Sequence, residues 1–443
     1  MKKIKPVFIL VMILTVLSVV LAACSGSSPA TSPSQSPSPS PSPETPVLET
    51  PAAPQNPVRP ERTPQLLPTG SGVTVIRADE WESAYPDIHA SYMRNGNNSE
   101  HYSYTEAYPY ITVLYEGMGF AFDYNSARGH VYSLTDLDNT GRPHLFANCF
   151  ACKTPDMHAL IAEIGDEAYA APYSDLLDRM VEPVSCFNCH ANDPEELIVT
   201  HQYVAKGFGD DFNTVSAESL SCAQCHVEYY FDPETRAVIL PYSSLSNMDP
   251  DSILEYYNNL TMPNGLVYAD YVNPRSGVRQ IKVQHPEFET YYGAGSHHKS
   301  RLGCADCHMG FAENDSGERF VNHEWMSPID NQIMLNERCS RCHTDLEYDI
   351  REIQAEVKER TNAIGAALAE LMEDLVLAVD SGDYTEEELD QVRMKFRDAQ
   401  FYWDFVFVEN SNGAHNSELT HQVLDKAETL CKETKALLDA LTS

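Results

Sequence analysis

The residues best suited to carry chemistry are ten cysteines in five pairs, with two residues between the members of each pair. A histidine directly follows four of these pairs. The four motifs are Cys186, Cys189 and His190; Cys222, Cys225 and His226; Cys304, Cys307 and His308; and Cys339, Cys342 and His343. In such a motif the thiols bond covalently to a haem and the histidine binds its iron. Zinc sites and redox dithiols also use close cysteine pairs, but they need no histidine in the fifth position, so the pattern favours c-type haem.

The fifth pair, Cys149 and Cys152, is followed by Lys153 in place of histidine. Lysine binds a metal only in its neutral form, and its ordinary pKa is about 10. A desolvated pocket and the positive charge of an iron both lower that pKa. A lapsed haem site or a dithiol is the alternative, but both thiols and their spacing persist in an otherwise intact series. We therefore expect a fifth haem here and expect it to be the reactive one.

The four histidine motifs each need a second iron ligand from elsewhere in the chain. A haem with histidine on both faces has no open coordination position, so it carries electrons and does not bind substrate. Twelve of the 16 histidines lie outside the motifs, and some of them are ordinary surface or core residues. Four stand out by their context in the sequence: His130, His297, His323 and His415.

Several polar residues near the motifs suit the surroundings of an open iron position. Glu228 and Tyr229 lie just after the histidine motif that ends at His226, and Gln284 and His285 lie downstream. Carboxylate, carboxamide and carbonyl oxygens are ligands for a hard cation such as calcium. His285 can supply protons and hydrogen bonds to a bound anion, and Arg142 is a candidate for holding its negative charge. Each residue taken alone also fits ordinary packing or surface exposure.

The N-terminal segments predict export and attachment rather than catalysis. Residues 1–23 combine a basic start with an apolar stretch, as signal peptides do. Leu21-Ala22-Ala23-Cys24 resembles a bacterial lipobox, which predicts a lipid anchor on Cys24. A plain secretory signal or an uncleaved anchor helix is the alternative. Residues 24–70 are rich in serine and proline, and we expect a disordered tether there.

The remaining chain predicts a mainly α fold in two regions. Residues 71–345 hold all five motifs at uneven spacing, so we expect a haem-binding catalytic region of short helices and long loops around five haems. Residues 346–443 show apolar residues at helical spacing. We expect long C-terminal helices over about 346–379, 386–408 and 417–441. Such helices either cover the haems or pair with a second subunit.

The charge of the chain excludes one class of partner. The formal net charge is −35, whereas nucleic-acid binding needs a basic surface. A strongly acidic surface by itself indicates only solubility. A small anionic substrate would therefore need a local positive patch.

Taken together, the motifs resemble those of the ammonia-forming cytochrome c nitrite reductases, a pentahaem cytochrome c family. The resemblance rests on the lysine motif, the four histidine motifs, the run Cys222–Phe231 and the run Gln284–Glu287. It extends over roughly residues 75–440. It implies the six-electron reduction of nitrite to ammonium in respiratory nitrite ammonification, with electrons delivered through four bis-histidine haems.

The resemblance also implies roles for individual residues. Lys153 is the proximal ligand of the active-site haem, and Arg142, Tyr229 and His285 line its distal pocket. The implied calcium ligands are the Glu228 carboxylate, the Tyr229 and Lys282 carbonyls and the Gln284 side chain. The implied distal ligands are His323 for the second haem, His130 for the third, His415 for the fourth and His297 for the fifth. The adjacent His298 is the alternative to His297.

The resemblance further implies partners and a location. The expected electron donor is a membrane-bound multihaem quinol dehydrogenase, and the C-terminal helices resemble the dimer interface of the family. With the lipobox, this predicts a lipid-anchored homodimer outside the cytoplasm, in the periplasm or on the outer cell surface. The competing interpretations are a non-catalytic multihaem electron conduit, with a protein ligand on both faces of every iron, and a related reductase that acts mainly on hydroxylamine or sulfite.

Overall fold

A computed structural model of the chain describes residues 56–57, 62–70, 73–143, 145–293 and 296–443. Within it, Pro54–Ser443 forms one compact unit. The expected signal peptide, the lipid-anchor residue Cys24 and most of the expected tether lie outside the described residues. All structural statements below concern the described part.

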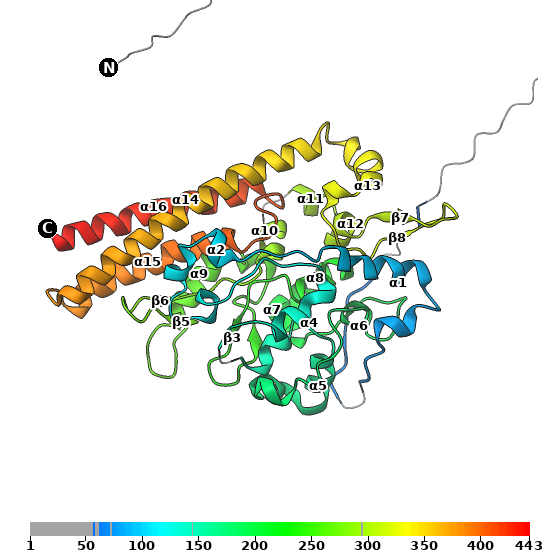
Figure 1. Ribbon diagram of the computed structural model, residues 1–443, viewed down its shortest axis with the longest axis horizontal. Coiled ribbons are helices and arrows are strands. Elements are labelled where there is room, and N and C mark those ends of the chain that lie inside the picture. The colour runs from blue at the N-terminus through cyan, green and yellow to red at the C-terminus, as the bar shows by residue number, and fades with distance from the viewer. Residues whose placement is uncertain (1–55, 58–61, 71–72, 144, 294–295) are drawn as a thin grey trace, which may run out of the picture. The chain divides into compact units, whose positions relative to one another are not determined.

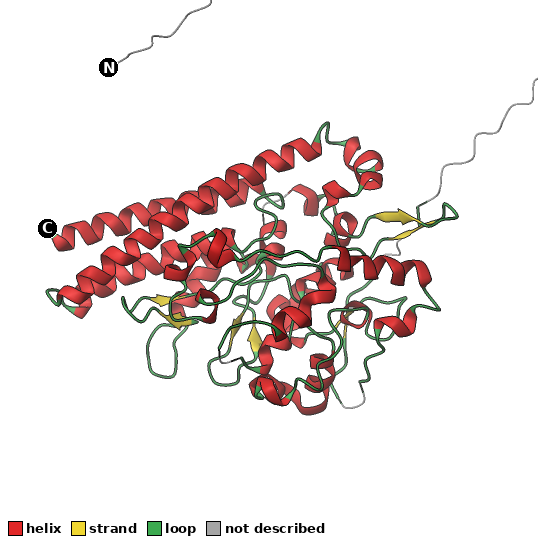
Figure 2. Cartoon of the chain, in the orientation of Figure 1, coloured by secondary structure: helices red, strands yellow, loops and turns green. Residues whose placement is uncertain are grey.

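Short helices and tight turns dominate the region that holds the cysteine motifs, and the helices there are 4 to 10 residues long. Figure 2 shows how much of this region is loop. The helices are α1 (Pro86–Met93), α2 (Tyr104–Ala107), α3 (Ile111–Leu114), α4 (Ser133–Asp138), α5 (Asp156–Ile164), α6 (Phe187–His190), α7 (Gln202–Phe208), α8 (Ala217–Ala223), α9 (Pro250–Asn259), α10 (Glu287–Tyr292), α11 (Ser296–Lys299), α12 (Cys304–His308) and α13 (Gln332–Glu337). The prediction of a mainly α fold with short helices and long loops is confirmed.

The described strands are only two or three residues long and form two-stranded sheets. They are β1 (Gln65–Leu66), β2 (Ile198–Val199), β3 (Tyr230–Phe231), β4 (Val238–Ile239), β5 (Tyr271–Val272), β6 (Arg279–Gln280), β7 (Phe311–Glu313) and β8 (Arg319–Val321). The β1–β2 pair is parallel, and the other three pairs are antiparallel hairpins. Sheets this small cannot form a core of their own. Their backbone hydrogen bonds instead hold neighbouring loop segments together.

Three long helices follow the last motif: α14 (Leu346–Ser381), α15 (Glu386–Phe407) and α16 (Ser417–Thr442). Figure 1 shows them side by side, in yellow, orange and red. Each begins at a side chain that accepts a backbone N–H of the first turn, from Asp345, Thr385 and Asn416 respectively. The bounds agree with the predicted helices to within about two residues. No described helix is long and apolar enough to cross a membrane.

The C-terminal helices share one apolar core with the motif region. Trp403 on α15 is fully buried, and its indole N–H donates to the Thr361 carbonyl on α14 at 3.0 Å. The Tyr110 ring, beside α3, meets Trp403 edge-on at 6.0 Å between ring centres. Helix α15 also packs against α9 and β6. The long helices are therefore in a position to shape the motif region and not only to cover it.

The end of the expected tether differs from the prediction. Gln65 and Leu66 pair with Ile198 and Val199, and the Arg62 guanidinium donates to the Glu195 carbonyl at 3.0 Å. Residues 62–67 are thus held against the folded unit, and the prediction of disorder as far as residue 70 was too long at this end. Composition alone missed this contact because a short strand needs only backbone groups and one half-buried apolar residue.

Gly365, near the middle of α14, is required by close packing. A Cβ at this position would lie 2.6 Å from the Tyr110 ring and 2.8 Å from Trp403 Nε1. Replacing glycine by alanine in a helix usually stabilises the helix by about 1 kcal/mol, but overfilling a packed core costs about 1–3 kcal/mol.

We expect Gly365→Ala to lower the thermal unfolding midpoint of the haem-loaded protein. The exposed neighbour variant Ala366→Ser should leave the midpoint nearly unchanged, and a midpoint raised by Gly365→Ala would contradict the packing argument.

Candidate functional site

Each cysteine motif is folded into a single helical turn. The backbone N–H groups of His190, His226 and His343 donate to the carbonyl of the first cysteine of their motif at 2.9, 3.0 and 2.9 Å. Helix α12 spans the motif Cys304–His308, and the Lys153 N–H donates to the Phe150 carbonyl at 2.9 Å. Residues at positions i, i+3 and i+4 of a helical turn share a face. Both thiols and the ligand of each motif therefore point the same way.

All five motifs open into one cavity of about 2320 Å³. Typical cofactor or ligand sites occupy about 300–1,000 Å³, so this cavity is more than twice as large as the upper end of that range. The ten motif cysteines around it are free thiols. A continuous space bounded by free thiols and imidazoles fits a group of covalently attached haems.

Across this cavity, each motif histidine faces one of the four histidines singled out in the sequence. The ring centres are 6.4 Å apart for His190 and His323, 6.1 Å for His226 and His130, 5.9 Å for His308 and His415, and 5.9 Å for His343 and His297. Two imidazoles that share a metal through bonds of about 2 Å have ring centres about 6 Å apart. Each pair thus has the spacing of two axial ligands of one iron. The His298 side chain lies outside the described residues, so the choice between His297 and His298 stays a prediction.

Contacts on Nδ1 fix the orientation of four of these rings. Nδ1 contacts a backbone carbonyl in His190, His308 and His323, at 2.6, 3.0 and 3.0 Å. Nδ1 of His415 contacts the Glu409 carboxylate at 2.7 Å. Burial lowers the pKa of His308 to about 4, which keeps this imidazole neutral, as metal binding requires.

Close backbone packing places His130. A Cβ on the preceding Gly129 would overlap the carbonyl oxygen of Asn95, so only glycine fits there. The Gly129 N–H also donates to the Asn98 carbonyl at 3.0 Å. The His130 ring then meets Trp325 edge-on, with ring centres 4.6 Å apart. Burial lowers the pKa of His130 to about 3, so it too is neutral.

Lys153 shares its cavity with Arg142, Tyr229 and His285. The Arg142 Nε donates to the Asp123 carbonyl at 2.8 Å, and its guanidinium carbon lies 3.8 Å from the centre of the Phe120 ring. No described residue accepts a hydrogen bond from its Nη atoms. Burial lowers the pKa of Arg142. A guanidinium removed from water with free donors is suited to binding an anion.

Tyr229 and His285 complete the lining of this part of the cavity. Burial raises the pKa of Tyr229 well above its ordinary value, so the phenol keeps its proton. The Nδ1 atom of His285 lies 3.8 Å from Oε1 of Glu287, which leaves Nε2 free. Burial lowers the pKa of His285, and Glu287 counteracts that effect. The arrangement provides one fixed cation and two groups that can donate protons or hydrogen bonds.

The expected calcium ligands also come together beside the cavity. Oε2 of the fully buried Glu228 accepts the Gln284 backbone N–H at 2.6 Å, and the Gln284 side chain donates to the Lys282 carbonyl at 3.0 Å. Burial raises the pKa of Glu228 well above its ordinary value, and the nearby Glu289 and Asp270 raise it further. Buried carboxylates crowded in this way favour a bound cation, and their oxygen atoms suit calcium.

The sequence reasoning missed two carboxylates that hold this segment. Asp270 accepts the Lys282 N–H at 2.8 Å. Asp404 on α15 lies 3.2 Å from the Lys282 Nζ and accepts the Val283 N–H at 3.0 Å. Lys282 and Asp404 are both buried, so each needs the other. The sequence alone could have pointed to Asp404, since it is the single carboxylate in the otherwise uncharged run Phe401–Phe407. A charge buried in such a run requires a partner.

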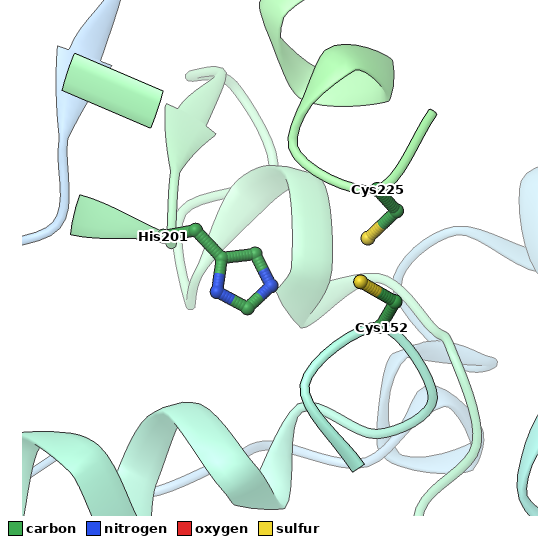
Figure 3. Close-up of side chains that lie close together, drawn as sticks. All are labelled: Cys152, His201 and Cys225. Atoms are coloured by element: carbon green, nitrogen blue, oxygen red, sulfur yellow. The ribbon is translucent and has the colours of Figure 1, made fainter. Parts of the chain in front are cut away.

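A cluster of Cys152, His201 and Cys225 has donor atoms within 4.8 Å of one another. Figure 3 shows the two sulfur atoms pointing toward each other, with the imidazole beside them. Nitrogen and sulfur donors would suit zinc, but each cysteine belongs to a different motif, and a zinc ion would take one thiol from both. The contact instead marks where the lysine motif and the third motif approach.

Further sulfur contacts order the other motifs. With the motifs counted along the chain from the lysine motif, the thiol of Cys222 in the third motif lies near that of Cys304 in the fourth. Cys307 of the fourth motif lies near Cys339 of the fifth. Cys189 of the second motif lies near both cysteines of the third. The motifs thus form a continuous series from the lysine motif through the third and fourth to the fifth, with the second beside the third.

Comparisons with known proteins agree with this geometry. A family model described as cytochrome c552 matches residues 77–443. The structure is similar to the catalytic subunit of the cytochrome c nitrite reductase from Desulfovibrio desulfuricans ATCC 27774, described with two calcium sites. The TM-score is 0.73 and the identity 26%, over 82% of this chain and 86% of that chain.

Two other cytochromes show weaker similarity. The outer cell wall cytochrome OcwA matches with a TM-score of 0.37 and 19% identity, over 68% of this chain and 48% of that chain. An undecahaem cytochrome from the S-layer of Carboxydothermus ferrireducens matches with a TM-score of 0.35 and 17% identity, over 70% of this chain and 41% of that chain. Similarity at this level supports no inference about function.

The family model therefore spans nearly all of the chain beyond its N-terminal segments, and it includes every cysteine motif. The similar solved structure covers most of both chains. This chain belongs to the cytochrome c552 family of multihaem c-type cytochromes.

Proposed function

We propose that this protein is an ammonia-forming nitrite reductase that reduces nitrite to ammonium with six electrons at the haem of the lysine motif. One observation carries the proposal. The four facing histidines are each matched with a histidine motif, so none of them is left for Lys153, whose cavity instead contains Arg142, Tyr229 and His285. The activity of the similar Desulfovibrio desulfuricans protein supports the same assignment.

Five covalent haems fit the thiols and imidazoles of the cavity. The proposed iron ligands are Lys153 alone for the first haem and the pairs His190–His323, His226–His130, His308–His415 and His343–His297 for the others. A haem held by Cys149, Cys152 and Lys153 would supply an iron that can bind nitrite and provide electrons for its reduction. The remaining chemistry belongs to the side chains that orient the anion and move protons.

Arg142 holds the negative charge of nitrite through its free Nη donors. His285 presents Nε2 to the anion, donates a proton to a departing oxygen and is reprotonated between steps. Tyr229 keeps its phenol proton and adds a hydrogen bond from the same side. These groups are fixed before the substrate arrives, so they stabilise developing charge without rearranging. On a chain with a net charge of −35, they form the local positive patch that an anionic substrate needs.

Calcium is the proposed occupant of the carboxylate cluster beside this pocket. Its ligands would be the Glu228 carboxylate, the Tyr229 and Lys282 carbonyls and the Gln284 side-chain oxygen. The Gln284 amide then presents its oxygen where its nitrogen now donates to the Lys282 carbonyl. The cation offsets the buried negative charge and orders the segment that carries His285.

The proposed electron route follows the contacts between motifs. Haems held by the lysine motif and the third motif would lie close enough to exchange electrons, because Cys152 and Cys225 lie close together. The fourth motif feeds the third across Cys222 and Cys304, and the second motif adjoins the third from another side. The haem of the third motif would thus be the last electron carrier before the haem of the lysine motif.

The partners and location remain part of the proposal. A membrane-bound multihaem quinol dehydrogenase fits as the electron donor, and the long helices α14–α16 fit as the interface of a homodimer. Covalent haem attachment places the protein outside the cytoplasm, and a lipid on Cys24 would hold it at the membrane.

The function is tested by supplying the reduced, haem-loaded protein with nitrite. We expect ammonium as the product, with six electrons consumed per nitrite, and a spectral change of one high-spin haem on titration with nitrite or cyanide. Steady-state rates with hydroxylamine and sulfite provide the comparison. No spectral change would identify an electron conduit, and a dominant rate with sulfite or hydroxylamine would overturn the nitrite assignment.

Lys153→His tests the special role of lysine. We expect all five haems to stay attached, because both thiols of the motif remain, while the spin state of the active-site haem changes and nitrite turnover falls. Haem content, the electronic spectrum and turnover measure these effects. Wild-type turnover in this variant would show that lysine is not functionally special.

Glu228→Ala tests the calcium site. Removing the only carboxylate in the proposed ligand set should release the metal and lower nitrite reduction by about 10- to 100-fold, as losses around metal sites commonly do. Elemental analysis and turnover measure the two effects, with the exposed Glu255→Ala on α9 as control. Wild-type calcium content in Glu228→Ala would remove Glu228 from the site.

A further inference from the structure

Glu287 lies between the imidazole of His226, in the third motif of the series that starts with the lysine motif, and the imidazole of His285 in the substrate pocket. It is the first residue of α10 and is 7% exposed. Its Oε2 is 3.6 Å from Nδ1 of His226, and its Oε1 is 3.8 Å from Nδ1 of His285. The two rings have centres 6.0 Å apart and cross at 68°. One carboxylate therefore faces a proposed iron ligand and a proposed substrate-binding residue.

A third group completes the surroundings of Glu287. The side chain and the backbone N–H of Asn410 both donate to Oε1, at 2.5 and 3.4 Å. The carboxylate thus faces four N–H groups if both imidazoles present Nδ1–H. A carboxylate offers about four acceptor positions, whereas a carboxamide oxygen offers only two. Glutamate fits this place in a way that glutamine cannot.

The other iron-ligand imidazoles show what is unusual here. Nδ1 of His190, His308 and His323 contacts a neutral backbone carbonyl. A carboxylate takes that place at His226 and at His415, where Glu409 lies 2.7 Å from Nδ1. The Glu409 side chain hydrogen-bonds with His415 and Ser411, and no hydrogen bond or ion pair among the described residues joins it to Arg142, Tyr229 or His285. Glu287 alone combines the two contacts among the described carboxylates.

We infer that Glu287 is a positioning residue that couples the third haem to the substrate pocket. Its carboxylate orients His226 through Nδ1, and His226 is the proposed ligand of the last haem on the electron route. It also orients His285, the proposed proton donor of the pocket, through Nδ1. A carboxylate acceptor strengthens the donor character of the ligating nitrogen and so stabilises the oxidised iron. The same carboxylate turns His285 so that its Nε2 faces the anion. The inference rests on the function proposed above and concerns the same site.

The test compares Glu287→Gln with Glu409→Gln in the haem-loaded protein. Both variants replace a carboxylate beside an iron-ligand imidazole with a carboxamide of nearly the same size. Only Glu287→Gln also alters a contact with His285. An EPR-monitored redox titration measures the midpoint potential of each bis-histidine haem, and optical titration with cyanide measures anion affinity at the lysine haem.

We expect Glu287→Gln to raise the potential of the third haem and to weaken cyanide binding by about 10-fold. Glu409→Gln should raise the potential of the fourth haem and leave cyanide affinity unchanged. An unchanged third-haem potential in Glu287→Gln would overturn the inference. A shifted potential with wild-type cyanide affinity would overturn it equally, and so would equal losses of affinity in both variants.

Glu287→Asp keeps the test decisive where Glu287→Gln fails to fold or to retain haem. It preserves the charge on a shorter side chain. We expect a third-haem potential near that of the wild type and weaker cyanide binding, because the shorter carboxylate cannot reach both imidazoles. Wild-type values of both quantities would contradict the inference. If the wild type binds no cyanide or nitrite, the proposed function fails, and the third-haem potential in Glu287→Gln then decides the inference.

Discussion

The spacing of paired imidazoles is the constraint on which the rest of this structure depends. Two rings that share one iron must lie with their centres about 6 Å apart, and each of the four motif histidines has this spacing, 5.9 to 6.4 Å, to one of the four histidines singled out in the sequence. Each pair joins segments far apart in the chain, such as His130 with His226 and His308 with His415. With an iron bound between the two rings, each pair would act as a cross-link around one cavity. Short helices and long loops suffice between them, because the haems that fit the cavity would provide much of the core.

The long C-terminal helices take part in the site as well as in the core. Asp404 reaches from α15 to the Lys282 ammonium and to the Val283 N–H, directly before Gln284 and His285. The segment after α15 supplies Asn410 to Glu287. A region that the sequence predicts to be a simple helical bundle thus helps to hold the segment Lys282–His285 in place. Any change in the packing of these helices is transmitted to the residues that would hold the anion and the calcium ion.

In this acidic chain, the neighbours of each buried carboxylate determine how its negative charge is compensated. Glu228 and Glu289 are buried and Asp270 is half-buried near Glu228, so a calcium ion bound to Glu228 would relieve an unfavourable cluster. Glu287 has the opposite environment, because two imidazoles face it and lower its pKa well below the ordinary value despite its burial. A buried glutamate thus suits a cation at one position, Glu228, and imidazole N–H groups at another, Glu287. The difference comes from the groups that surround each carboxylate.

Much of this molecule was predictable because its signals are local. The motif spacing follows from one helical turn, which places Cys186, Cys189 and His190 on a common face whatever the rest of the chain does. The same holds for the periodicity and caps of the C-terminal helices, and the predicted family and mainly α fold are confirmed. The distal histidines were recognisable by context, although their pairing came from family resemblance. Asp270, Asp404 and the bridging position of Glu287 were not predictable, since each depends on a contact between segments that no local pattern connects. The order of the motifs in space has the same origin: sulfur atoms such as those of Cys152 and Cys225 meet only after the chain has folded around the cavity.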